Sequence, residues 1–236
     1  MFHRTLRSVW YTSVCLICLT AMRQPAQAGP PLICHPFEIA NAQSLPWSNI
    51  NEWRAVKGDY DLNRLVNDTL ALLTPGTPVI VRMETMRRAT IYAVWAARDR
   101  EVGYKVTGQK VADELLARLM TRVQEAASKG KTDALALFDA GYLLASYGQS
   151  GWQPNQQPTV DAYAMVRKAA ELSGDATMEL AAALATRDKA AQRAHLQKAV
   201  VGAPEGSLLA RNLVSHFGDR GRNLAELRAS VGSTQH

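Results

Sequence analysis

A cysteine and a histidine lie side by side at positions 34 and 35, and this pair is the first candidate for chemistry. A closed zinc site needs four nitrogen or sulfur ligands at suitable spacing, and no residue near Cys34 completes such a set. A c-type haem site needs two cysteines in a CxxCH motif, and Cys34 has no such neighbour. We therefore expect Cys34 and His35 to be a buried thiol and a hydrogen-bonding imidazole, with no bound cofactor. A Cys34-dependent redox or metal site is the alternative.

The segment RMETMRR (82–88) places three arginines around one glutamate. Arginine forks match carboxylates and other anions, so an anion clamp is one interpretation. The other is a solvated helix face, on which Glu84 and Arg88 pair at a spacing of four residues. We favour the solvated face and keep Arg82 and Arg87 as candidate contacts for a partner.

Aromatic residues mark a second candidate region. Trp152 falls in the polar segment GQSGWQPNQQPT (148–159), which is expected to be an exposed loop. An aromatic side chain there is either a binding anchor or folds back onto the helices. Tyr142 and Tyr147 precede the loop and present the same two alternatives, so all three are candidate partner-binding residues.

Motifs of known catalytic chemistry are missing. The sequence contains no HExxH, GxSxG, P-loop or GxGxxG motif, and no nucleophile and base can be paired from it. No catalytic residue is predicted, and an enzyme is the least favoured of the function classes.

The first 28 residues have the three parts of a secretory signal. Arg4 and Arg7 are followed by an apolar run from Val9 to Met22, and Ala26-Gln27-Ala28 is a small–x–small cleavage pattern. The apolar run is shorter than the roughly 20 residues of a spanning helix. We predict cleavage after Ala28 and a soluble periplasmic or secreted chain without a transmembrane segment.

Removal of this leader changes the charge and the cysteine count. The whole chain has 27 basic and 21 acidic side chains, and the leader contains three of the arginines and no acid. The remaining excess of three positive charges is not clustered, so nucleic acid is not an expected partner. Cys34 is then the single remaining cysteine. It cannot form a disulfide within the chain, but a disulfide with another molecule stays possible.

The elements that position these residues are helices. Residues 29–58 contain several prolines and are expected to form an irregular arm that packs on the rest, with a short helix near 48–55. From residue 59 to 230 the apolar residues recur with helical spacing. Helices are expected at 61–73, 78–98, 107–128, 133–148, 159–172, 175–186, 189–201, 205–217 and 221–230, followed by a disordered tail (231–236). The fold class is therefore all-α, built from antiparallel hairpins.

Two stretches 30 residues apart repeat one pattern: KAAELSGDATMEL (168–180) and KAVVGAPEGSLLA (198–210). The longer segment 136–185 resembles a Sel1-like repeat, a relative of the tetratricopeptide repeat, and a degraded second copy spans 187–217. The matching residues are Ala140, Gly141, Tyr147, Gly148, Gly151, Ala162, Tyr163, Lys168, Ala169, Ala170, Gly174 and Ala176. Met165 and Val166 replace the family's usual aromatic residue, and residues 59–128 lack the motif.

The resemblance implies a short α-solenoid that binds a protein or peptide on a helical surface, with no catalytic residue. We therefore expect an exported binding or scaffold module with a protein or peptide partner.

Overall fold

The described part of the chain is helical throughout. A computed structural model describes residues 31–50, 52–96, 102–152 and 160–232. These ranges contain helices, turns and irregular segments but no strand, so the predicted all-α class is confirmed. None of their helices combines the length and the apolar character that crossing a bilayer requires. The predicted signal peptide (1–28) lies outside the described residues.

The helix boundaries lie within about three residues of the predicted ones, except at the start of the helix at 102–128 and at the helical turn at 31–34, which was not predicted. They are α1 (Pro31–Cys34), η1 (Leu62–Arg64), α2 (Leu65–Leu72), α3 (Val79–Thr90), the π-helix η2 (Ile91–Trp95), α5 (Val102–Ser128), α6 (Ala134–Ser150), α7 (Ala162–Ser173), α8 (Ala176–Ala185), α9 (Lys189–Gly202), α10 (Leu208–Phe217) and α11 (Leu224–Gly232). Helix α5 begins five residues before the predicted start, and α11 extends two residues past the predicted end.

Aspartate side chains cap five of these helices at their N-termini. Asp61, Asp133, Asp161, Asp175 and Asp188 each accept a hydrogen bond from a backbone N–H in the first turn. Each bond satisfies a donor that has no partner within the helix. The local sequence therefore sets where these helices start.

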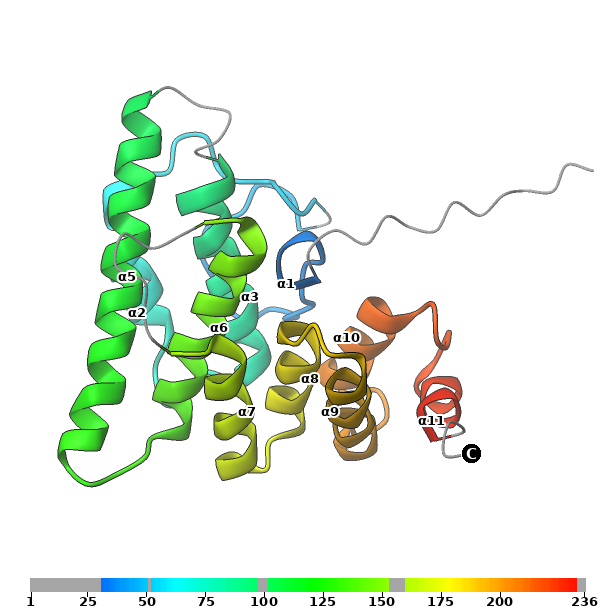
Figure 1. The fold of residues 1–236 in the computed structure, drawn as a ribbon. Helices are drawn as coiled ribbons and strands as arrows, with labels where there is room; N and C mark the ends of the chain where they lie inside the picture. Colours follow the sequence, from blue (N-terminus) through cyan, green and yellow to red (C-terminus); the bar gives the residue numbers. More distant parts are fainter. Residues whose placement is uncertain (1–30, 51, 97–101, 153–159, 233–236) are drawn as a thin grey trace, which may run out of the picture.

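Helices α6 to α9 lie side by side, each in contact with the next along the chain (Figure 1). Small residues allow this close packing. A Cβ atom added at Gly141 of α6 would lie 2.6 Å from the Cβ of Met165 in α7. The same addition at Gly202 of α9 would lie 2.6 Å from the Cβ of Ala176 in α8. Small residues thus permit a close approach of two helices at both crossings.

Helix α3 is buried along its whole length, although it contains four charged residues. The helices α2, α6 and α8 pack against it on several sides. The N-terminal arm covers another part, because its Leu32, Phe37 and Leu45 join the same apolar core. The charged side chains of α3 are therefore inside the protein.

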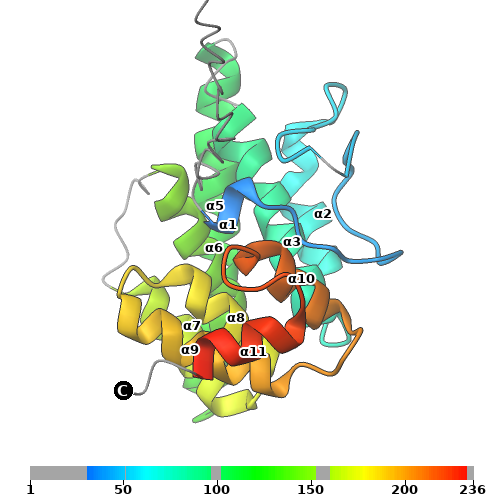
Figure 2. The same ribbon diagram turned by 90° about the vertical axis from the view of Figure 1, so that its right-hand side faces the viewer.

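The arm packs as predicted but contains a different helix. Residues 48–50 and 52–55 form turns and irregular segments rather than the predicted short helix, and among the described residues of the arm the helical turn is α1. The arm also reaches the C-terminal half, where α10 and α11 pack against α8 and α9 (Figure 2). There the backbone N–H of Glu38 donates to Asn212 Oδ1 at 2.8 Å, and Asn212 Nδ2 donates to the Glu38 carbonyl at 2.9 Å.

Candidate functional site

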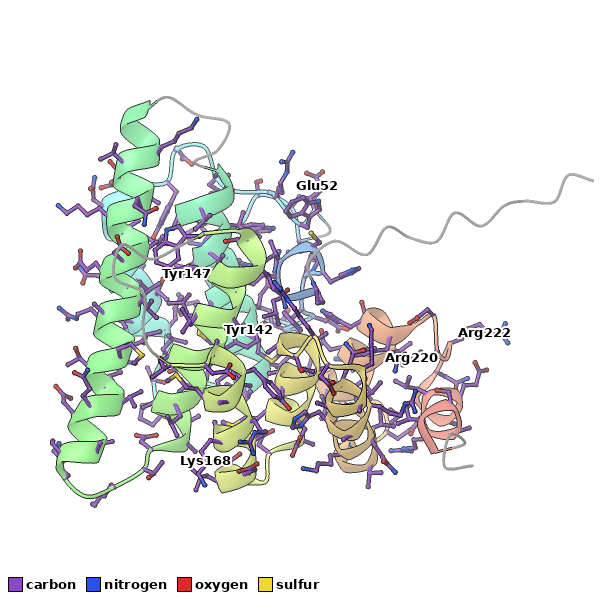
Figure 3. All side chains as sticks on the ribbon, in the orientation of Figure 1. Glu52, Tyr142, Tyr147, Lys168, Arg220 and Arg222 are labelled. Atoms are coloured by element: carbon purple, nitrogen blue, oxygen red, sulfur yellow. The ribbon has the colours of Figure 1, made fainter. Side chains whose placement is uncertain are left out.

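The five residues predicted to contact a partner are all buried. Tyr142 and Tyr147 point into the helical interior from α6 (Figure 3). Trp152 lies against Tyr147, with ring centroids 4.4 Å apart, so it folds back rather than anchoring a partner. Arg82 and Arg87 are 1% and 0% exposed. In this conformation Tyr142, Tyr147, Trp152 and Arg87 lie in the interior, and Arg82 borders a cavity.

The RMETMRR segment is not the solvated face that the sequence indicated. Glu84 is fully buried, and its two oxygens accept hydrogen bonds of 2.7–2.8 Å from Arg87 and Arg88. The arginines also donate to backbone carbonyls of the arm: Arg87 to Ile33 and Trp53, and Arg88 to Leu45. The cluster is an internal anchor for the arm.

Burial and charge act against each other at Glu84. Desolvation would raise the pKa of the carboxyl group, but the attraction and hydrogen bonds of Arg87 and Arg88 together outweigh it, so the pKa is lowered. The backbone N–H of Phe37 adds a further bond to Glu84 Oε2 at 3.0 Å. Glu84 is therefore a structural anion rather than a proton donor.

The second buried ion pair joins α3 to α6. Arg82 Nη1 donates to Asp139 Oδ2 at 2.6 Å, and both side chains are at most 3% exposed. Arg82 also donates to the carbonyls of Thr77 and Thr74 in the α2–α3 turn. Asp139 Oδ1, in contrast, is buried without a hydrogen-bond partner among the described residues.

This pair lines a cavity of about 680 Å³ that opens to solvent between the α2–α3 turn and the α5–α6 turn. That volume is in the range of small-ligand pockets. The wall is partly apolar, through Leu73, Pro75 and Leu135. The remaining lining residues are polar or small: Arg82, Arg122, Glu125, Ala126, Lys129, Lys131, Thr132, Asp133, Ala136 and Asp139.

The charges of the cavity are not fully compensated. Arg82 and Asp139 pair with each other, and Asp133 is occupied as the N-cap of α6. Lys129 and Lys131 are exposed at the mouth and form no ion pair within the described chain. Arg122 lies close enough to Asp139 to lower its pKa. The mouth therefore carries Arg122, Lys129 and Lys131 against the carboxylates of Glu125 and Asp133, which leaves a small excess of positive charge.

Desolvation dominates the titration of Asp139. Burial raises the pKa of its carboxyl group to about 6, because desolvation exceeds the attraction of Arg82 and Arg122. The Oδ1 atom beside the cavity is therefore an acceptor that no described residue satisfies, and a perturbed pKa of this kind marks a candidate functional site.

The Cys34–His35 pair has no metal-binding surroundings in the structure. Across the residues that the structure describes, no three His, Cys, Asp or Glu side chains converge as metal ligands. Cys34 is a free, half-buried thiol, and burial raises its pKa, which disfavours the reactive thiolate. His35 lies 5.6 Å from the ring of His216, which in turn stacks on Phe37 at 4.4 Å.

A hydrogen-bonded chain that sequence reasoning missed links α7, α8 and α9. The Nδ1 atom of His195 bonds to Glu179, and its Nε2 atom bonds to the hydroxyl group of Tyr163 at 2.8 Å. Lys198 also donates to Glu179, at 3.1 Å. The spacing of 16 residues between Glu179 and His195 has no motif, so the fold alone brings them together. These hydrogen bonds join neighbouring helices, and none of the four residues lines the cavity described above.

Comparisons with known proteins return no relative: no family model matches the chain, and neither the curated proteins nor the solved structures include a match.

Proposed function

We propose that this chain is an exported binding module that recognises a protein or peptide through the cavity between the α2–α3 and α5–α6 turns. The observation that supports the proposal is the buried, unpartnered oxygen of Asp139 beside a solvent-open, partly apolar cavity with a cationic mouth. Buried polar atoms are nearly always hydrogen-bonded in folded proteins. A binding partner would supply the missing donor.

The helical scaffold is assigned to the Sel1-like and tetratricopeptide type of repeat within this proposal. Support comes from α6 to α9, where Gly141 and Gly174 occupy motif positions with a physical role. Gly141 allows the close crossing with α7, and Gly174 ends α7 with a φ of +66°. Helical repeats of this kind present extended surfaces to partners.

Export to the periplasm or the extracellular space is part of the same proposal. It is supported by the basic, apolar and small-residue regions of the first 28 residues. The test is amino-terminal sequencing of the protein recovered from its host: a mature chain that begins at Gly29 would support export, and an intact leader would contradict it.

The binding proposal is tested by capture of partners with the mature chain and two charge-reversed variants. Lys129→Glu with Lys131→Glu reverses the mouth of the cavity. Lys189→Glu with Arg193→Glu is the matched control, because both residues are exposed on α9 and neither lines the cavity. A partner bound at the cavity is captured by the wild type and the control and is lost from the mouth variant.

The same partners on all three proteins, or no specific partner at micromolar concentration with all three folded, would contradict the proposal. Circular dichroism and melting curves of each protein establish the folding.

A further inference from the structure

The floor of the cavity has one open hydrogen-bonding position. Arg82 uses its Nε, Nη1 and Nη2 atoms on the Thr77 carbonyl, Asp139 Oδ2 and the Thr74 carbonyl. Asp139 uses Oδ2 on Arg82, and its Oδ1 has no partner among the described residues. The missing group is a donor, because an ionised carboxylate only accepts hydrogen bonds.

The charges favour a neutral donor over a cationic one. The guanidinium of Arg82 already neutralises Asp139, and Arg122 is a further cation near the same carboxyl group. An incoming ammonium group would lose its hydration beside the guanidinium groups of Arg82 and Arg122, and the carboxylate of Asp133 would offset only part of that repulsion. A primary amide or a hydroxyl group supplies the same hydrogen bond at a lower desolvation cost.

The mouth of the cavity favours anions around that donor. Lys129 and Lys131 belong to the exposed α5–α6 turn, and Arg122 lies one turn of α5 before Glu125. Carboxylates are attracted to such a set of cations, and this attraction weakens as salt is added. Leu73, Pro75 and Leu135 offer apolar surface to the stem of an inserted side chain.

The surroundings favour a peptide over a nucleic acid. Single-stranded nucleic acids bind where aromatic side chains stack on the bases beside a cationic groove. Among the described residues that line this cavity, none is aromatic. A peptide with acidic residues on both sides of one amide or hydroxyl side chain matches the mouth and the floor together.

We infer that the cavity binds an acidic peptide segment that inserts a primary-amide or hydroxyl side chain toward Asp139. This inference rests on the proposed binding function and specifies the chemistry of the ligand. The acidic residues contact the cationic mouth, and the inserted side chain donates to the open acceptor at the floor.

The test uses the mature chain and three fluorescently labelled heptapeptides with blocked ends. The first has a central glutamine between three glutamates on each side, the second has a central leucine in the same frame, and the third has a central glutamine between lysines. Fluorescence anisotropy measures the dissociation constant of each. Varying the peptide tests the floor without altering the buried Arg82–Asp139 pair.

The acidic glutamine peptide is expected to bind about tenfold more tightly than the leucine peptide, since the leucine leaves the buried acceptor unsatisfied. The lysine peptide is expected not to bind. Lys129→Glu with Lys131→Glu is expected to weaken the acidic peptide by about tenfold, and Lys189→Glu with Arg193→Glu to leave it unchanged. Added salt is expected to weaken binding of the acidic peptide.

Equal affinity for the glutamine and leucine peptides would overturn insertion at Asp139. Binding of the lysine peptide, or tighter binding of a labelled oligothymidylate than of any peptide, would overturn the acidic-peptide class. If the mouth variant loses its captured partners while none of these peptides binds, the ligand class alone fails and the proposed function stands.

Discussion

At the scale of single residues, two buried side chains titrate with opposite effects on stability. Burial raises the pKa of Asp139 to about 6, so the folded state holds this proton more tightly than the unfolded state. Burial lowers the pKa of His216 to about 4, so the folded state resists protonation there. Between pH 4 and 6, acidification therefore stabilises the fold through Asp139 and destabilises it through His216.

Replacement of His216 is expected to expose this opposition. His216→Phe keeps an aromatic ring against Phe37 but cannot be protonated. Between pH 7 and pH 5 the wild type loses about 2 kcal/mol of unfolding free energy through His216, because the unfolded histidine, with a pKa near 6.5, binds the proton. The variant avoids this loss. Urea unfolding at the two pH values measures the difference, and equal pH dependence of both proteins would contradict the assignment.

Asp139→Asn provides the complementary measurement. It removes the group whose protonation stabilises the fold, so the variant is expected to lose about 1 kcal/mol more than the wild type between pH 7 and pH 5. The reference for each protein is its own stability at pH 7, because the substitution also changes the buried contact with Arg82. A variant with unchanged pH dependence would show that Asp139 does not titrate in this range.

At the scale of elements, glycines have different roles within one helix. Gly141 and Gly148 both belong to α6. A Cβ at Gly141 would lie within 3.1 Å of Met165, Ala162 and Val166, whereas a Cβ at Gly148 would meet nothing within 4 Å. Gly141 therefore sets the distance between α6 and α7, and Gly148 does not.

Substitution of the two glycines is expected to change stability in opposite directions. Gly141→Val forces α6 and α7 apart and is expected to lower the unfolding free energy by about 1–3 kcal/mol, as overpacking does. Gly148→Ala is expected to raise it by about 0.5–1 kcal/mol, because alanine loses less backbone entropy in a helix. Chemical denaturation measures both. A neutral Gly141→Val would contradict the tight crossing.

At the scale of the whole molecule, the N-terminal arm connects parts of the chain that are far apart in sequence. Glu38 bonds to Asn212 through both of its backbone groups, across 174 residues. The backbone N–H of the preceding residue, Phe37, donates to the side chain of Glu84 in α3. The arm thus holds α3 and α10 in one structure.

Deletion of residues 29–58 is expected to lower the melting temperature strongly. The deletion removes the carbonyl acceptors of Arg87 and Arg88 and the apolar cover of α3. Loss of partners from buried charges costs about 3–5 kcal/mol. Glu38→Ala is the control within the arm: its ion pair with Arg211 is about half exposed, so less than about 1 kcal/mol is expected. An unchanged melting temperature after the deletion would contradict the anchoring role.

The comparison of sequence and structure separates local from long-range information. Helix positions were predictable because apolar spacing and aspartate caps are local signals, as at Asp133 and Asp161. The burial of Glu84 and Arg87 could not be predicted, because their hydrogen-bond partners in the arm lie 34–54 residues away in an irregular segment. The cavity escaped prediction for the same reason, since Arg82 and Asp139 meet across 57 residues.

The manner in which the arm is anchored determines how its sequence can evolve. Arg87 and Arg88 hold the main-chain oxygens of Ile33, Leu45 and Trp53, and every amino acid supplies such an oxygen. Mutations at those three positions therefore leave the hydrogen bonds intact. The one constraint on them is that the new side chain must fit its surroundings. The two arginines have no equivalent substitute, since lysine lacks the planar fork. Among homologues, the sequence of the arm is expected to vary while Arg87 and Arg88 are conserved.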